Sequence, residues 1–217
     1  MGGMAHFWGR AMTTVKKNRS PNNDKFKELI LYIADKSSGD KPFGATKLNK
    51  LLFYADFLAY LQFGTGMTNQ RYQKLENGPA PRALIPITGK MESRGEIAYR
   101  DENYYGKSKK RLVPLRDPDL SEFSDDEIEL VNRIVAEFLG KNAAAMSGFS
   151  HEFIGWQLAK IGEDIPYEVA FVRAIPATSK MEQYGAGLES LATELLEHEE
   201  LPSAQNNKKR TVPKRTG

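Results

Sequence analysis

Apolar residues recur at helical spacing in the two segments that open the folded part of the chain. Phe26, Leu29 and Ile33 fall at positions i, i+3 and i+7, which predicts a helix of roughly three turns. Residues 46–63 predict a second helix, and its apolar side chains lie almost all the way round. Because a helix of this kind is buried on most of its sides, we expect it at the centre of the core.

The next stretch of the chain is less regular. Residues 67–76 are short and polar, and residues 77–81 (Asn-Gly-Pro-Ala-Pro) predict a turn, since two prolines and a glycine restrict the backbone there. A helix can restart over residues 82–91, where Pro86 would shorten or kink it.

The period then changes from helical to alternating. The alternating pattern predicts two strands, over residues 96–100 and 110–115, on either side of a polar connection that contains Gly106. This pattern predicts a β-hairpin, or wing. The predicted tip is basic, with Lys107, Lys109, Lys110 and Arg111.

A capping signal marks the clearest helix of the second half. Ser124 and Glu127 have the spacing of a capping box, and the apolar face that follows ends at Gly140. A short helical turn is predicted over residues 143–146, and Ser150 or a neighbour is expected to cap another helix.

The last apolar pattern is heptad-like and lies in a segment rich in glutamate. Its spacing of 3, 4, 3 and 4 predicts a C-terminal helix over residues 176–201, which either packs against the protein's own core or docks on a partner. The apolar positions are Met181, Tyr184, Leu188, Leu191 and Leu195.

These elements together predict a mainly α-helical fold of the α+β class, a compact helical domain with a small β-hairpin. We expect this domain over residues 23–175, followed by the C-terminal helix. Residues 1–22 show no periodicity, and residues 202–217 contain too few apolar side chains to order themselves, so we expect both to be disordered basic tails.

The net charge of +3 hides an uneven distribution of charge along the chain. The 217 residues include 31 basic and 28 acidic ones. Nine of the basic residues lie in residues 1–20 and 201–217, which contain no acidic residue, so residues 21–200 hold 22 basic and 28 acidic residues. An acidic body argues against sequence-specific DNA binding, although basic tails are compatible with weak electrostatic contacts.

Candidate chemistry is sparse. The absence of cysteine excludes disulfides, thiolate metal sites and cysteine nucleophiles. The three histidines do not have metal-ligand spacing, and no nucleophile-elbow pattern occurs, so we expect no catalytic site, no metal and no cofactor. No apolar run of about eighteen residues and no signal-peptide core is present, so we expect a cytoplasmic protein without a membrane partner.

Two blocks of the sequence resemble a known family. Residues 47–56 (K-L-N-K-L-L-F-Y-A-D) are followed about twenty residues later by G-P-A-P, and a second block runs from S-H through a tryptophan to I-P-Y-E. In order and spacing they resemble the Panacea domain of the SocA-like antitoxin family, over roughly residues 25–171. The resemblance rests on Lys47, Leu48, Lys50, Leu51, Tyr54, Gly78, Pro79, Ser150, His151, Trp156 and Pro166.

The resemblance implies a non-enzymatic antitoxin. Such proteins are usually encoded beside a toxin and neutralise it in a protein complex, and at least one relative is thought to deliver its toxin to an ATP-dependent protease. Because the family pairs with toxins of unrelated types, the identity of the toxin does not carry over. The expected partner is a cognate toxin encoded nearby, in a hetero-oligomer or with self-association of the antitoxin. A winged-helix-like DNA-binding regulator is the rival hypothesis.

We expect the residues shared with the Panacea domain to determine the fold. We expect the leucines and Tyr54 to build the central helix, Gly78 and Pro79 to set a turn, Trp156 to fill core volume, and His151 to be structural. The toxin contact is therefore expected elsewhere, on two sets of residues: Lys107, Lys109, Lys110 and Arg111 in the hairpin, and Tyr184, Leu188, Leu191 and Leu195 in the C-terminal helix.

Overall fold

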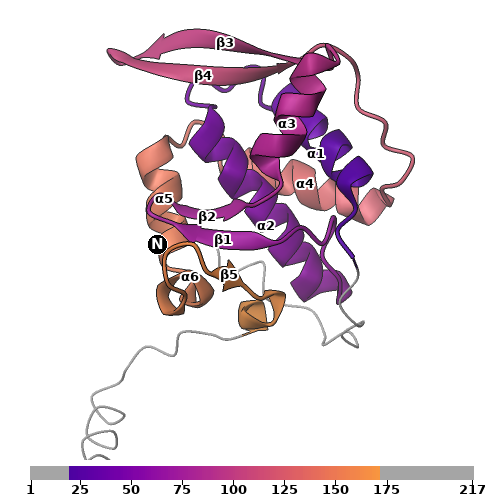
Figure 1. Ribbon diagram of the computed structural model, residues 1–217, viewed down its shortest axis with the longest axis vertical. Helices are drawn as coiled ribbons and strands as arrows, with labels where there is room; N and C mark the ends of the chain where they lie inside the picture. The colour runs from indigo at the N-terminus through magenta and orange to yellow at the C-terminus, as the bar shows by residue number, and fades with distance from the viewer. Residues whose placement is uncertain (1–19, 172–217) are drawn as a thin grey trace, which may run out of the picture. The chain divides into compact units, whose positions relative to one another are not determined.

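The computed structural model describes residues 20–171, and helix α2 (Ala45–Phe63) lies at their centre (Figure 1). It contacts α1 (Asn23–Lys36), α4 (Asp125–Glu137) and α5 (Ala143–His151). The side chain of Asn22 caps α1 by accepting a hydrogen bond from the backbone N–H of Lys25. Both predicted N-terminal helices are confirmed, and α2 is buried on most of its sides, as its sequence pattern predicted.

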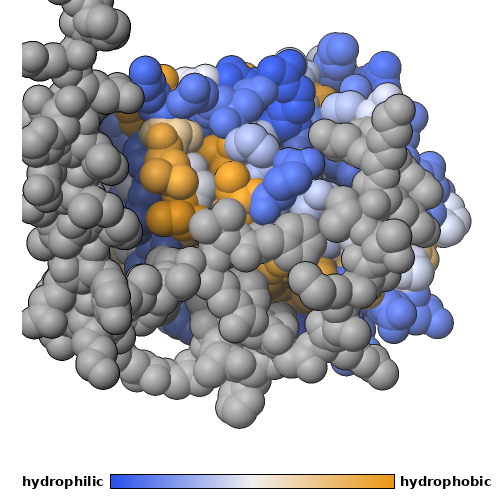
Figure 2. Space-filling view, turned by 90° about the horizontal axis from the view of Figure 1, so that it is seen from below, coloured by the Kyte–Doolittle hydropathy of each residue, from blue (hydrophilic) through white to orange (hydrophobic). Residues whose placement is uncertain are grey.

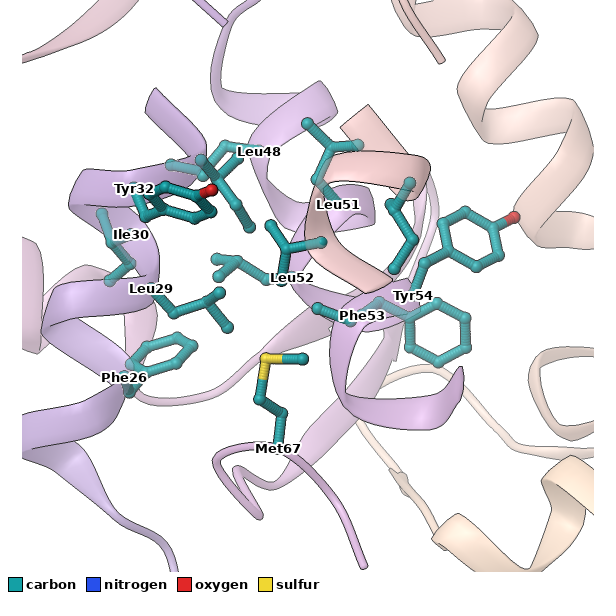
Figure 3. Packing of buried hydrophobic residues seen from close by; sticks show 14 of the residues in the cluster. Phe26, Leu29, Ile30, Tyr32, Leu48, Leu51, Leu52, Phe53, Tyr54 and Met67 are labelled. Carbon is teal, nitrogen blue, oxygen red and sulfur yellow. The ribbon is translucent and has the colours of Figure 1, made fainter. Parts of the chain in front are cut away.

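The core lies where α1, α2 and α4 meet. Leu29, Leu52 and Val131 contribute one fully buried side chain from each helix. Figure 3 shows Leu29 pointing toward Leu52, with Met67 beside them, and Tyr54 at the other end of the cluster with its hydroxyl directed away from α1. Each fully buried side chain of this size contributes about 1.5–3 kcal/mol to the stability of the fold.

A small antiparallel sheet replaces the turn predicted at residues 77–81. Strands β1 (Tyr72–Leu75), β2 (Gly78–Pro81) and β5 (Asp164–Ile165) pair in the order β2-β1-β5. The turn lies at residues 76–77, between β1 and β2. The prediction was wrong because β2 is an edge strand. Pro79 and Pro81 occupy the positions whose backbone groups point away from β1, so the missing N–H groups cost no ladder hydrogen bond.

The predicted hairpin is confirmed. Strands β3 (Ile97–Tyr104) and β4 (Lys107–Pro114) pair along their whole length beside α3 (Leu84–Ser93), at the top of Figure 1. Pro86 lies in the first turn of α3, where a backbone N–H has no partner within the helix, so it neither kinks nor ends the helix.

The capping box of α4 is confirmed, with Ser124 at the N-cap and Glu127 at N3, but the helix ends at Glu137, before Gly140. The helix predicted after Ser150 is α6 (Ile154–Leu158), but its N-cap is Phe153, which makes no side-chain capping hydrogen bond, and Ser150 lies inside the preceding helix. Asn142 caps α5, which continues through Ser150, because its side chain accepts the N–H of Ala145 and fixes the start of the helix early.

Two short elements complete the described chain. Helix α6 (Ile154–Leu158) follows α5, and the 3₁₀ helix η2 (Tyr167–Phe171) follows β5. The fold is therefore α+β and mainly helical, as predicted. Within residues 20–171, every helix falls short of the length and hydrophobicity that crossing a bilayer requires.

Candidate functional site

Residues far apart in the sequence meet around Gly78, which opens β2 with a φ of 101°. A Cβ atom at Gly78 would lie 2.6 Å from Nζ of Lys50 on α2 and 2.4 Å from Oγ of Ser150 on α5. Such distances leave no room for any residue larger than glycine, and the positive φ favours glycine as well. We call Lys50, Gly78, Pro79 and Ser150 the Gly78 cluster. It joins α2, β2 and α5.

Lys50 is the unusual member of this cluster. Its side chain is almost fully buried, and its Nζ donates a hydrogen bond to the carbonyl oxygen of Pro79 at 3.1 Å. Within residues 20–171 no carboxylate forms an ion pair with it. Burial lowers the pKa of Lys50 to about 8, since the charged form has lost its water without gaining an opposite charge.

Lys47, one turn earlier, is buried in a different way. Its Nζ lies 2.5 Å from a carboxylate oxygen of Asp40 and donates to the carbonyl oxygens of Phe138 and Lys141 at 2.6 and 2.9 Å. Burial lowers the pKa of Lys47, and the Asp40 carboxylate opposes that shift. Lys47 therefore fastens the start of α2 to the segment that ends α4.

The aromatic residues of the shared motif lie beside the cluster. Tyr54 stacks on Phe138 with ring centroids 4.9 Å apart, and burial raises the pKa of its hydroxyl. Among the described residues, neither this hydroxyl nor Nε2 of His151 has a hydrogen-bond partner, although both atoms are buried.

Trp156 lies at the border of the core, not within it as predicted. Its ring stacks on His151 at 3.8 Å, and its indole N–H donates to the carbonyl oxygen of Leu75 at 3.0 Å. The indole N–H needs a polar partner, which the end of β1 supplies. This position connects α6 to the sheet.

The other motif residues are structural in their contacts. Leu48 and Leu51 are buried in α2, and the carbonyl oxygen of Pro166 accepts a hydrogen bond from Val169 at the start of η2. Ser150 donates its hydroxyl proton to the carbonyl oxygen of Ser147. These two hydrogen bonds are local, one within α5 and one at the start of η2.

Asp56 is a buried residue that sequence reasoning missed. Its carboxylate accepts hydrogen bonds from the backbone N–H and the hydroxyl of Thr68, both at 2.6 Å, and from the hydroxyl of Tyr72 at 2.7 Å. It thereby fixes the loop between α2 and β1. The available signal was an acidic residue within a helix that is apolar almost all round.

The basic residues predicted at the hairpin tip do not share one surface. Arg111 is buried and donates to the carboxylate of Glu102 and to the carbonyl oxygens of Ser37 and Asp40. Lys109 pairs with Glu102 at 3.0 Å and donates to the carbonyl oxygen of Phe43. Both side chains hold the hairpin against residues 37–43, so they are not the free surface contacts that we expected.

Glu102 is the centre of this attachment. The neighbouring cations Arg111 and Lys109 lower the pKa of its carboxyl group to about 2. Lys110 points to the opposite face of the hairpin, is exposed and stands across from Asp101; Lys107 occupies the first position of β4, opposite Tyr104. Of the predicted basic residues whose side chains are described, only Lys110 remains available to a partner.

Tyrosines, missed in the sequence analysis, occupy the exposed end of the hairpin. The side chain of Tyr105, in the turn, is 89% exposed, whereas that of Tyr99, which stands across from Leu112 toward the base of the hairpin, is 38% exposed. Tyr104 contacts Tyr105 edge to face, with ring centroids 4.7 Å apart. The pair of tyrosines before Gly106 was the signal that could have identified this surface.

Two further surface features lie on this domain. A polar hollow of about 440 Å³ separates the hairpin from the turn after α1 and is lined by residues that include Ser38, Arg100 and Tyr104. Leu158 and Ile161 are also exposed; Figure 2 views the side on which α6 and β5 lie, and hydrophobic residues reach the surface there.

The predicted contacts Tyr184, Leu188, Leu191 and Leu195 lie outside the described residues. Within residues 20–171, no group of three or more acidic or histidine side chains is arranged to hold a metal ion.

A comparison with models of protein families shows which family the chain belongs to. The family model described as the SocA-like antitoxin, Panacea domain, matches residues 48–157. The chain belongs to this family. Searches among curated proteins and among solved structures found no match.

The Panacea domain match confirms the resemblance predicted from the motifs. It begins inside α2 and ends inside α6, so it includes the whole Gly78 cluster and the whole hairpin. Helix α1, Lys47 and Pro166 lie outside the matched residues, although α1 packs directly on α2. The Panacea domain of this chain thus depends on a helix that precedes the matched region.

Proposed function

We propose that this protein is the antitoxin of a toxin–antitoxin pair and that it neutralises its cognate protein toxin by binding it in a stoichiometric complex. Membership of the SocA-like antitoxin family supports the antitoxin role. The observation that carries the binding mechanism is the hairpin β3–β4. Arg111 and Lys109 fasten it to the body, while Tyr105 is exposed in its turn and Lys110 is exposed midway along β4, across from Asp101.

Burial of the reactive groups supports action by binding rather than by catalysis. Lys50 and Ser150, which could serve as a base and a nucleophile, are 2% and 0% exposed. A substrate would have to displace β2 to reach either of them, since Gly78 covers both. We therefore propose a non-enzymatic protein that needs no cofactor.

The charge distribution supports a protein partner. The hairpin, residues 97–114, carries five basic and two acidic residues, whereas the rest of residues 20–171 carries 15 basic and 20 acidic ones. A basic projection on an acidic body can match a partner surface of mixed charge, and complementary fields speed the encounter of two proteins. The same acidic body would repel a nucleic acid backbone.

Co-expression with the product of the adjacent reading frame tests this proposal. We expect the toxin to arrest growth when it is expressed alone, and we expect co-expression to restore growth. The two proteins should co-elute as a complex of defined mass in size-exclusion chromatography with light scattering.

Two other outcomes would contradict direct neutralisation. Rescue that disappears in a host without its ATP-dependent proteases, with a shortened toxin half-life in the wild-type host, would indicate a protease adaptor. Rescue without a complex, together with tight and steeply salt-dependent binding to promoter DNA, would indicate a winged-helix-like regulator.

A further inference from the structure

The turn of the hairpin contains a tyrosine in a conformation that tyrosine rarely adopts. Tyr105 and Gly106 have φ angles of 50° and 75°, so the two-residue connection is a type I′ turn. Asparagine, aspartate and glycine are the residues favoured at the first of these positions, because a positive φ brings a large side chain close to its own backbone. Tyr105 therefore strains the turn.

Within the described chain, a ring contact with Tyr104 offsets only part of this strain. The ring of Tyr105 is 89% exposed and touches the edge of the Tyr104 ring. The turn itself is held by other groups, since the Asn103 side chain accepts the N–H of Gly106 at 2.9 Å and the strands pair on both sides. The fold would be served better by asparagine, which indicates that the tyrosine is kept for an intermolecular contact.

We propose that Tyr105 is the specificity-determining anchor of toxin binding and that it inserts into an apolar pocket of the toxin bordered by acidic side chains. This inference rests on the proposed antitoxin function. Tyrosine is enriched among the residues that dominate binding energy, since its ring buries a large apolar area and its hydroxyl retains a hydrogen bond. The exposed Lys110 on the same hairpin accounts for the acidic border, whereas Arg100 is already paired with Glu102.

The attachment of the hairpin suits this role. Arg111 donates to the backbone of residues 37–41 on the body, and Lys109 donates to the carbonyl oxygen of Phe43, so the strands that carry Tyr105 are fixed before the partner arrives. A prearranged aromatic side chain loses little conformational entropy on binding. A protein pocket is favoured over a nucleic acid base, because the body behind the hairpin is acidic.

The decisive variant is Tyr105→Asn, which supplies the residue that the turn prefers. We expect it to raise the melting temperature of the free antitoxin by about 2 °C and to weaken its affinity for the toxin at least tenfold, an effect typical of an anchor residue. Tyr105→Phe keeps the ring and should retain most of the affinity. The matched control is Ile85→Asn on α3, which removes another large side chain, 83% exposed, and should leave affinity within about twofold.

Affinity is measured by calorimetric titration of the purified full-length chain into the product of the adjacent reading frame. The inference alone fails if the wild-type chain binds the toxin and Tyr105→Asn binds equally well. Both the inference and the proposed function fail if the wild-type chain does not bind it. A loss of promoter-DNA binding in Tyr105→Asn, with toxin binding intact, would also overturn the inference and would assign the tyrosine to base stacking.

Discussion

The Gly78 cluster and the β3–β4 hairpin use the same residue types for opposite purposes. Lys50 is buried against Pro79, while Lys110 on the hairpin is exposed. Ser150 meets a neighbouring helix and strand, while Ser108 of β4 faces solvent. A lysine or serine in a family motif therefore does not by itself mark the binding surface. Its role follows from whether tertiary contacts bury it or leave it exposed.

The comparison also separates what defines the fold from what reaches a partner. Lys50, Gly78 and Ser150 belong to α2, β2 and α5, so a change in one of them alters how three elements meet. The exposed residues Tyr105 and Lys110 both belong to the hairpin, so changes there leave the rest of the domain as it is. Substitutions in the two regions should therefore give opposite profiles of stability and binding.

The largest effect is expected for Gly78→Ala. The added methyl group would overlap Lys50 and Ser150, and the φ of 101° is strained for alanine, so the free energy of unfolding should fall by about 3–5 kcal/mol. The control is Gly89→Ala on α3, where no atom lies within 4 Å and alanine should raise stability by up to about 1 kcal/mol. Urea unfolding measures both. Equal stability of Gly78→Ala and wild type would show that the cluster is not packed as described.

A smaller loss, of about 3 kcal/mol, is expected for Lys47→Met. The substitution leaves the buried carboxylate of Asp40 without its counter-ion, and two carbonyl oxygens lose their donor. The double variant Lys47→Met with Asp40→Asn should regain part of the lost stability, since no buried charge remains. A single variant that unfolds at the wild-type urea concentration would contradict the buried ion pair.

Lys50→Met should raise the free energy of unfolding by about 1–2 kcal/mol at pH 7. It removes a buried ammonium whose pKa is lowered to about 8, and this gain exceeds the loss of one hydrogen bond to Pro79. A loss of stability in Lys50→Met would contradict this prediction. It would show that the hydrogen bond from Lys50 to Pro79 stabilises the fold more than burial of the ammonium destabilises it.

The pH dependence gives an independent check on Lys50. Below pH 8 the lysine is charged in both the folded and the unfolded chain, and the cost of burying it is fully present. As pH rises from 8 toward the ordinary lysine value of 10.5, the folded state releases the proton first, so the unfolded state binds more protons and the free energy of unfolding rises. Lys50→Met should remove this rise when unfolding is followed between pH 7.5 and 9.5.

The smallest effect on stability is expected for Lys110→Ser. The side chain is exposed, so the free energy of unfolding should change by less than about 0.5 kcal/mol. The association rate with the toxin should fall modestly at low ionic strength and match the wild-type rate at high salt, because an exposed charge acts mainly through steering. Stopped-flow measurements over a range of salt concentrations test this. A rate that does not change at low salt would remove Lys110 from the contact.

The elements with strong periodicity could be predicted from the sequence. Helices α1, α2 and α4 and the β3–β4 hairpin follow their apolar patterns and the Ser124 capping signal. Strand β2 was missed because its two prolines usually end a strand, and only the pairing with β1 shows that they sit on the outer edge. Ser150 was expected at a cap because α5, which begins after Asn142 and continues through Ser150, has little apolar pattern to show its length.

The site was less predictable because burial depends on tertiary contacts. The motif identified the residues of the Gly78 cluster, but nothing local indicates that Lys50, Gly78 and Ser150 meet across more than seventy residues. Arg111 looked like a surface charge, since its carbonyl partners lie in the turn after α1. The exposure of Tyr105 depends in turn on which face of the hairpin lies against the body.

The two prolines of β2 have a consequence for how the free protein behaves in the cell. An open sheet edge normally offers donors and acceptors that can template another strand and start aggregation. At Pro79 the outer edge has no donor, and its acceptor is already taken by Lys50; at Pro81 the donor is also missing. This edge is closed to strand addition, which protects the free protein there against edge-to-edge self-assembly.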